Sequence, residues 1–178
     1  MVNAIRQGDR IEKITIIRNG PEANAFKADQ AAFDALLQER TIAEAARIKA
    51  QRDKDIAQIE AKYPKATLTD SGIRYVIQKP GTGEKPGKGK TVALNYKGSL
   101  LSGKVFDGSD FHGGPLAFQV GLGQIIPGWE EMVLDMKQGE KRLVVIPPEL
   151  AYGEQGAGNG IIPGNSFLVF EMELVQIR

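Results

Sequence analysis

The chain has no cysteine, and its 178 residues include a single histidine and a single tryptophan. Without cysteine it can form neither a disulfide nor a thiolate nucleophile. One histidine, His112, supplies neither a histidine metal cluster nor a serine–histidine triad. No apolar run approaches the roughly 20 residues that cross a bilayer, and residues 1–10 lack the apolar core of a signal peptide. We therefore expect a cytoplasmic protein that does not enter membranes and binds no metal or other cofactor.

The charge balance excludes a second class of partner. The formal net charge is +1, and no dense basic stripe is present, so we expect no binding to nucleic acid. The segment Lys88-Gly89-Lys90-Thr91 is similar to the end of a phosphate-binding loop, but Glu84 stands where the first glycine belongs. This segment is therefore interpreted as a solvated connection.

Three regions differ in composition. Residues 1–23 are strand-like and end in the turn Asn19-Gly20-Pro21. Residues 24–66 are predicted to be a helical linker or dimerisation helix, because residues 24–63 contain eleven alanines and neither glycine nor proline. A single helix of that length would extend about 60 Å. A solvated spacer helix, a helix that makes a homodimer, and a helical hairpin are the three alternatives.

Residues 67–178 form the third region, which is rich in predicted strands. Its last strand alternates apolar and charged residues over part of its length, which is typical of a half-buried antiparallel strand. The predicted strands are 73–77, 92–96, 143–146 and 167–175, and one short helix is predicted at 127–136. The expected fold class is α+β: a curved antiparallel half-barrel sheet wrapped on one short α-helix, preceded by a long N-terminal helical segment.

Aromatic residues are spaced widely along the third region, and most lie in or beside predicted strands. A curved sheet would gather them around one concave space, and a cavity walled by rings with one or two polar groups suits a small ligand. Asp107 lies among them, in the predicted turn Phe106-Asp107-Gly108-Ser109. The six rings are Tyr96, Phe106, Phe118, Trp129, Tyr152 and Phe170.

Several ordered sequence blocks identify the third region more closely. They are Asn95-Tyr96-Lys97-Gly98, Val105-Phe106-Asp107-Gly108-Ser109, Gln124-Ile125-Ile126-Pro127-Gly128-Trp129-Glu130-Glu131, Ile146-Pro147-Pro148-Glu149-Leu150-Ala151-Tyr152-Gly153, Ile161-Ile162-Pro163 and Leu168-Val169-Phe170. With these blocks, residues 68–178 resemble an FKBP-type peptidyl-prolyl cis-trans isomerase domain. The resemblance implies an enzyme that accelerates rotation about X–Pro bonds in unfolded or flexible protein segments and so aids folding. It implies no covalent step.

The resemblance also assigns roles to individual residues. Asp107, Tyr152, Phe106 and Trp129 are the implied catalytic residues: Trp129 forms the pocket floor, Asp107 faces the twisting amide and Tyr152 donates its hydroxyl to the substrate. The Ile126 N–H is implied to bond a substrate carbonyl. The implied substrate-binding residues are Tyr96, Leu116, Phe118, Ile125, Ile126, Ile161, Ile162 and Phe170. The implied partners are proline-containing polypeptides and macrolide inhibitors of the rapamycin type.

The chain departs from the family pattern at two places. Leu116 stands where the family commonly has an aromatic wall residue, which predicts a shallower pocket and weaker macrolide binding. The family often places an arginine after the aspartate to hold the carboxylate, and Asp110-Phe111-His112 supplies none. Two alternatives to an isomerase stay open: a module that binds proline-containing partners without turnover, and a chaperone whose long helix grips unfolded chains.

The first residues carry a second, shorter resemblance. Residues 2–12 and 14–18 are similar to the final strand of a bacterial cyclophilin, an unrelated isomerase fold. About twenty residues cannot form that barrel. The resemblance implies that the chain is a fragment of a cyclophilin–FKBP fusion.

Overall fold

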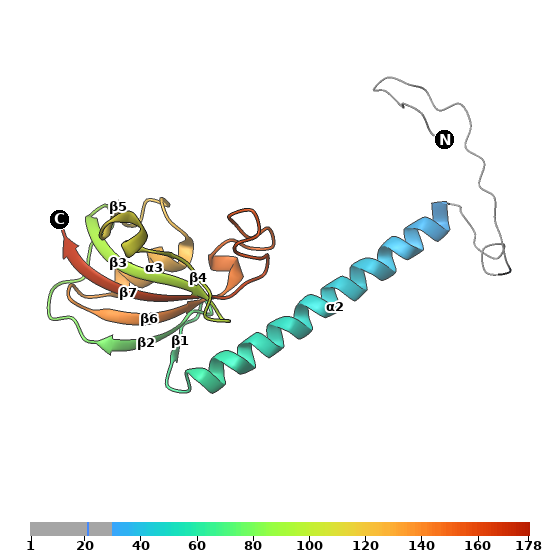
Figure 1. The fold of residues 1–178 in the computed structure, drawn as a ribbon, viewed down its shortest axis with the longest axis horizontal. Coiled ribbons are helices and arrows are strands. Elements are labelled where there is room, and N and C mark those ends of the chain that lie inside the picture. The colour runs from blue at the N-terminus through green and yellow to red at the C-terminus, as the bar shows by residue number, and fades with distance from the viewer. Residues whose placement is uncertain (1–20, 22–29) are drawn as a thin grey trace, which may run out of the picture. The chain divides into compact units, whose positions relative to one another are not determined.

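A computed structural model of the chain describes residue 21 and residues 30–178. Within them, seven strands make one antiparallel sheet in the order β1-β2-β6-β7-β3-β4, and β5 also pairs with β3 (Figure 1). The elements are α2 (Gln30–Lys62), β1 (Thr67–Leu68), β2 (Arg74–Lys79), β3 (Thr91–Leu100), β4 (Val105–Gly108), the 3-10 helix η1 (Ser109–His112), β5 (Leu116–Gln119), α3 (Pro127–Asp135), β6 (Lys141–Ile146), the 3-10 helix η2 (Pro148–Leu150) and β7 (Leu168–Ile177). This arrangement confirms the predicted α+β fold.

The structure corrects several details of the prediction. The turn expected at Phe106–Ser109 is wrong, because Phe106, Asp107 and Gly108 lie in strand β4. Strands β4 and β5 have four residues each, too few for a clear alternation of apolar and polar side chains, and they form by pairing with β3. A hairpin is excluded for the described part of the helical region, since α2 runs without a break. The strand-like segment expected at 1–23, apart from residue 21, lies outside the described residues.

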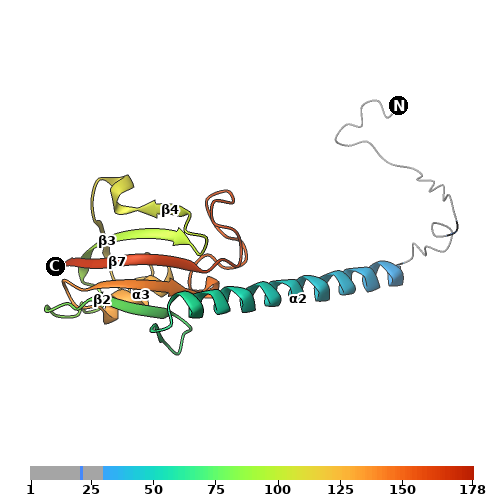
Figure 2. The same ribbon diagram turned by 60° about the horizontal axis from the view of Figure 1, so that its bottom comes forward.

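Strand β6 is covered on both faces, which explains its apolar sequence. Val144 and Ile146 point into the core under α3. Val145 points the other way, into a second cluster with Ile59 of α2 and Phe167. Alternate residues of a strand face opposite sides of a sheet, so a strand buried on both sides has few places for polar side chains. Figure 2 shows α3 against the strands of the sheet.

Helix α3 places the single tryptophan in the core. Pro127 occupies the first turn of α3, where the missing N–H costs nothing. Gly128 allows α3 to approach β6 closely, because a Cβ built on it would lie 2.5 Å from a side-chain carbon of Ile146. Trp129 follows directly and is buried, as are Val133 and Met136. All three residues belong to the core cluster of the domain.

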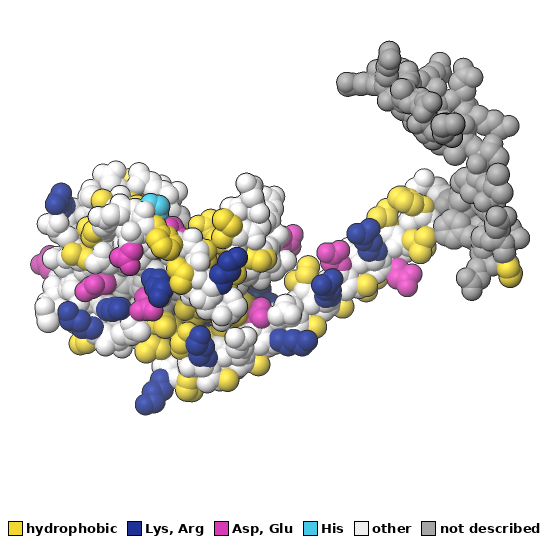
Figure 3. Space-filling model, in the orientation of Figure 1, with side chains coloured by type: hydrophobic (Ala, Val, Ile, Leu, Met, Phe, Trp, Pro, Cys, Tyr) yellow, Lys and Arg dark blue, Asp and Glu magenta, His cyan; other side chains and the backbone are white. Residues whose placement is uncertain are grey.

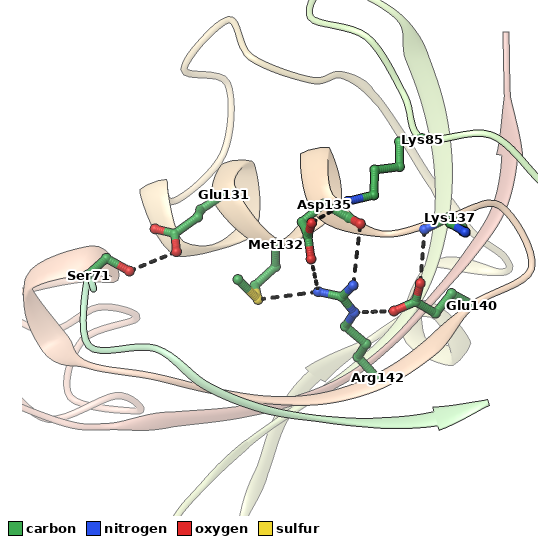
Figure 4. Close-up of polar contacts among 8 residues, drawn as sticks. All are labelled: Ser71, Lys85, Glu131, Met132, Asp135, Lys137, Glu140 and Arg142. Atoms are coloured by element: carbon green, nitrogen blue, oxygen red, sulfur yellow. Dashed lines mark hydrogen bonds and ion pairs between the residues drawn. The ribbon is translucent and has the colours of Figure 1, made fainter. Parts of the chain in front are cut away.

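A buried arginine attaches the end of α3 to the sheet (Figure 4). Arg142 of β6 is only 3% exposed; it forms an ion pair with buried Glu140 and a second one with Asp135 at 2.9 Å. Its guanidinium also lies 4.6 Å from the ring centroid of Tyr75. Lys85 binds the same Asp135 at 2.5 Å. Because a buried charge is tolerated only when it is paired, these contacts fix the position of α3 and of the tryptophan it carries.

The chain divides into two compact units, residues 1–46 and residues 47–178. The second unit includes the last part of α2, where Ile59 is fully buried against Val145, Phe167 and Val169. The domain boundaries predicted at 23/24 and 66/67 stay predictions. Among the helices that the structure describes, none is both long enough and apolar enough to span a bilayer.

Candidate active site

Five of the six predicted rings meet in one cluster, which we call the ring cluster: Tyr96, Phe106, Phe118, Trp129 and Phe170. Trp129 lies at its centre, with ring centroids 4.8 Å from Tyr96, 5.1 Å from Phe170 and 6.3 Å from Phe118. Phe106 joins through Phe170 at 5.8 Å. The pairs with Tyr96 and Phe170 are edge-to-face, which is a favoured geometry for aromatic rings. The indole N–H of Trp129 finds no hydrogen-bond acceptor among the described residues, so the floor of the cluster is apolar in its contacts.

An irregularity in β4 brings two consecutive residues to this site. β4 pairs with β3 through Asp107 with Gly98 and Val105 with Ser99, and the register shifts between these pairs, leaving Phe106 unpaired. In a regular strand, neighbouring side chains point to opposite faces. A bulge removes that restriction and redirects a side chain. Phe106 therefore packs on Phe170 while Asp107 bonds Tyr96.

The Asp107 carboxylate is held at both of its oxygens. Tyr96 donates its hydroxyl to Oδ2 at 2.8 Å, and the Gly108 N–H donates to Oδ1 at 2.8 Å. His112 Nε2 also lies 2.8 Å from Oδ1. Burial alone would raise the pKa of the Asp107 carboxyl, but these hydrogen bonds and the charge on His112 together hold that pKa below its usual value. Asp107 is therefore ionised and fixed, without the arginine that the family often supplies.

The charge of this carboxylate acts on two tyrosine hydroxyls. Burial, then the hydrogen bond to Asp107 and the negative charge of Asp107, raise the pKa of Tyr96 far above its usual value. Burial and the charge of Asp107 also raise the pKa of Tyr152. Both hydroxyls therefore keep their protons at neutral pH. Tyr152 is 41% exposed, so it lies at the edge of the site rather than within the ring cluster.

The aliphatic residues that the resemblance assigns to substrate binding differ in how closely they pack. Ile125 and Ile126 are partly buried against the core, and Ile162 is buried within it. Ile161 and Leu116 are exposed, by 50% and 37%. The Ile126 N–H, which the resemblance assigns to a substrate carbonyl, donates to no other residue in the described part of the chain. It is therefore free to bind a ligand.

Charged residues surround a different hollow, next to η1 on the outer face of the sheet. It has a volume of about 310 Å³, and its lining includes Lys97, Asp110, Lys141, Glu171 and Glu173. A hollow lined by both positive and negative side chains does not suit an apolar ligand, whereas the apolar surface of the ring cluster does. No group of three or more potential metal ligands occurs among residues 30–178. In Figure 3, apolar side chains (yellow) lie beside the single histidine (cyan), which is His112.

Three contributors to this site were missed in the sequence. The sequence assigned His112 no catalytic or binding role, but its Nε2 bonds the Asp107 carboxylate. Ser109 accepts a hydrogen bond from the Tyr96 N–H at 2.9 Å, which ties η1 to β3. Gly98 lies beneath Phe106 and Phe170, where a Cβ would come within 2.8 Å of both rings. The only sequence signal for these roles is their closeness to Tyr96 and Asp107 along the chain.

Replacing Gly98 by alanine should disturb the ring cluster. Gly98→Ala forces the rings of Phe106 and Phe170 apart, and overpacking of this kind costs about 1–3 kcal/mol of unfolding free energy. Gly87→Ala is the matched control, because a Cβ there meets nothing closer than 4.0 Å; it should change stability by less than about 0.5 kcal/mol. Urea unfolding and near-ultraviolet circular dichroism measure both effects. Equal behaviour of the two variants would contradict the close packing under the rings.

Comparison with known proteins agrees with this geometry. The family model described as FKBP-type peptidyl-prolyl cis-trans isomerase matches residues 82–175. The chain is 36% identical over 196 residues to the FKBP-type isomerase FkpA of Escherichia coli strain K12, covering 100% of this chain and 70% of FkpA. It is 51% identical over 108 residues to FK506-binding protein 1A of Neurospora crassa, covering 60% of this chain and 89% of that protein.

A solved structure supports the same relationship. The peptidyl-prolyl cis-trans isomerase of Pseudomonas syringae pv. tomato has a TM-score of 0.64 and 38% sequence identity, and the match covers 75% of this chain and 94% of that one. The alignment with FkpA runs through the first residues as well, and the proposed cyclophilin origin of residues 1–20, which lie outside the described part, stays a prediction. The chain belongs to the FKBP-type peptidyl-prolyl cis-trans isomerase family and is an isomerase of X–Pro bonds.

Proposed function

We propose that the ring cluster binds the proline of an unfolded or flexible segment with an apolar residue before the proline. Trp129 lies at the centre of the cluster and Tyr96, Phe106, Phe118 and Phe170 surround it, which supports a floor-and-walls arrangement around a proline ring. Ile125 and Ile162 extend the apolar surface from two loops, one before α3 and one before β7. The single observation that carries this proposal is that five rings distant in sequence contact one another beside a fixed carboxylate.

The chemistry that such a site must perform is modest in energy. The barrier to rotation about the amide is about 18–20 kcal/mol because the planar form is conjugated, and uncatalysed X–Pro exchange takes tens to hundreds of seconds. A thousandfold acceleration requires only about 4 kcal/mol of transition-state stabilisation. The twisted amide has lost conjugation and is less polar than the planar form. An apolar surface therefore binds the twisted form better, which is differential binding of the transition state.

The polar groups at the edge of the cluster orient the substrate and stabilise the twisted amide. The free Ile126 N–H binds the carbonyl of a neighbouring substrate peptide, and the Tyr152 hydroxyl donates a second hydrogen bond. Loss of conjugation leaves the carbonyl carbon with more positive character, and the Asp107 carboxylate stabilises it. The carboxylate is already oriented by Tyr96, Gly108 and His112, so little reorganisation is needed when the amide twists.

The role of Asp107 can be tested against a neighbouring acidic residue. Asp107→Ala should lower kcat/KM for a proline peptide by about tenfold, equivalent to about 1.4 kcal/mol of transition-state stabilisation, because the carboxylate is lost while the rings stay in place. Asp110→Ala, three residues away and exposed, should leave the rate unchanged. Exchange spectroscopy by NMR measures the rates, and circular dichroism checks the fold.

The same measurements separate the isomerase from the first alternative, a module that binds without turnover. Equal rates for the two variants would remove Asp107 from the mechanism. Binding of the peptide by the unmodified protein without faster exchange would instead favour a module that holds proline-containing partners.

We also propose that the ring cluster accepts a macrolide. The Neurospora relative is named for binding FK506, and a macrolide would use the same apolar surface as proline. Leu116 offers an exposed aliphatic side chain at the edge of the site, which supports weaker binding than an aromatic residue would give. The cytoplasmic location expected from the sequence stays a prediction.

For the described start of α2 we propose a role in homodimerisation. Phe33, Leu36 and Leu37 are exposed by 58%, 50% and 47%, and their spacing places them on one side of the helix. Three large apolar side chains exposed together on a helix favour contact with a second apolar surface. A second copy of the chain supplies the same stripe, which suits the symmetric contact of most homodimers.

Light scattering tests the dimer. The unmodified chain should have twice the mass of one chain, and the double variant Phe33→Ser with Leu37→Ser should have the mass of one. Ile42→Ser is the matched control: Ile42 is 67% exposed, but it lies nine residues after Phe33, about half a turn around the helix. A single-chain mass for the unmodified protein would exclude the dimer.

A further inference from the structure

His112 contacts the Asp107 carboxylate at the exposed edge of the site. Its Nε2 lies 2.8 Å from Asp107 Oδ1, and the two side chains are 59% and 40% exposed. The ionised carboxylate only accepts hydrogen bonds, so Nε2 must carry a hydrogen and donate it. The other ring nitrogen, Nδ1, is then the one that gains or loses a proton. Histidine is the side chain that ordinarily changes charge between pH 5 and 8.

We propose that His112 is a positioning residue for Asp107 and that its protonation makes the isomerase more active at the acidic end of this range. The inference rests on the role proposed above for Asp107. When the imidazole is charged, its hydrogen bond to the carboxylate is reinforced by charge, and such bonds are roughly twice as strong as neutral ones. The carboxylate then keeps one orientation towards the substrate. When the imidazole is neutral, Asp107 keeps its bonds from Tyr96 and Gly108 but loses the ionic contact.

Asp107 and the two tyrosines each keep one charge state across this range. The pKa of Asp107 is lowered below the usual aspartate value of about 4, so its carboxylate stays ionised from pH 5 to pH 8. Tyr96 of β3 and Tyr152 of the loop after η2 have raised pKa values, so both stay neutral. The adjacent hollow also has charged side chains in its lining, among them Asp110 on η1 itself and Lys97 on β3. A change of activity between pH 5 and 8 therefore reports on the imidazole.

The local backbone supports a positioning role. η1 spans only four residues and starts directly after β4. Ser109, at the start of η1, is 6% exposed and receives the Tyr96 N–H, so the short helix is fixed to the sheet. Gly113, with φ 75°, ends η1 in the left-handed conformation that glycine adopts without strain. The Gly113 N–H donates to the Ser109 carbonyl, so the turn between the carboxylate and the imidazole is hydrogen-bonded at both ends.

A pH profile of kcat/KM tests the proposal. The substrate is a blocked Leu–Pro peptide with no group that titrates between pH 5 and 8, and exchange is followed by NMR because a coupling protease would add its own pH dependence. For the unmodified protein, kcat/KM should fall about two- to fivefold from pH 5 to pH 8, the size expected for an exposed ion pair. Because the chain has one histidine, its imidazole signal can be followed in the same samples. The two midpoints should coincide.

Three variants separate positioning from a structural effect. His112→Arg should keep the high rate across the whole range, and His112→Gln should keep the low rate, both without the pH dependence. Asp110→Asn is the control: it removes the other charge of η1 and should retain the profile of the unmodified protein. A flat profile for the unmodified protein, or a sloping one for His112→Gln, would overturn the proposal. If Asp107→Ala is as active as the unmodified protein, the role of Asp107 fails first; if it is impaired and the profile is flat, only the role of His112 fails.

Discussion

The edge-to-face packing of rings around Trp129 is the contact on which the rest of the site depends. α3 has nine residues, too short to be stable alone, so the position of the indole is set by what the helix packs against. Gly128 brings the helix onto Ile146, and buried Arg142 ties its last turn to β6. The sheet supplies the other rings, so the site forms only when helix and sheet are both in place.

The polar half of the site depends on directional hydrogen bonds rather than on apolar packing. The ring cluster is held by apolar contacts, which have little directionality, whereas the carboxylate of Asp107 is oriented by hydrogen bonds from Tyr96, Gly108 and His112. In the mechanism we propose, both parts contribute: the rings bind a transition state that is less polar than the planar amide, and the fixed carboxylate stabilises its altered charge distribution. The bulge in β4 joins the two, since it lets consecutive residues serve both halves.

Sequence patterns predicted the large elements and not the fine contacts. β6, β7 and α3 follow from apolar runs and helical spacing, because burial decides their structure. β4 and β5 could not be predicted with the same success. Four residues are too few to show an alternation of apolar and polar side chains, and these strands form because they pair with β3. The resemblance named the rings, but the ion pair of His112 with Asp107 depends on the turn of a 3-10 helix, and the role of Gly98 depends on rings from β4 and β7. Such contacts arise from tertiary geometry, which local spacing does not encode.

The central claim is that the proline ring lies on Trp129, and the single tryptophan of the chain allows a direct measurement. Tryptophan fluorescence should change saturably when a Leu–Pro peptide is added, with a midpoint equal to its inhibition constant against a second proline peptide. The matching Leu–Ala peptide should leave the emission unchanged. A proline peptide that is isomerised rapidly while the emission stays constant at saturation would contradict the account.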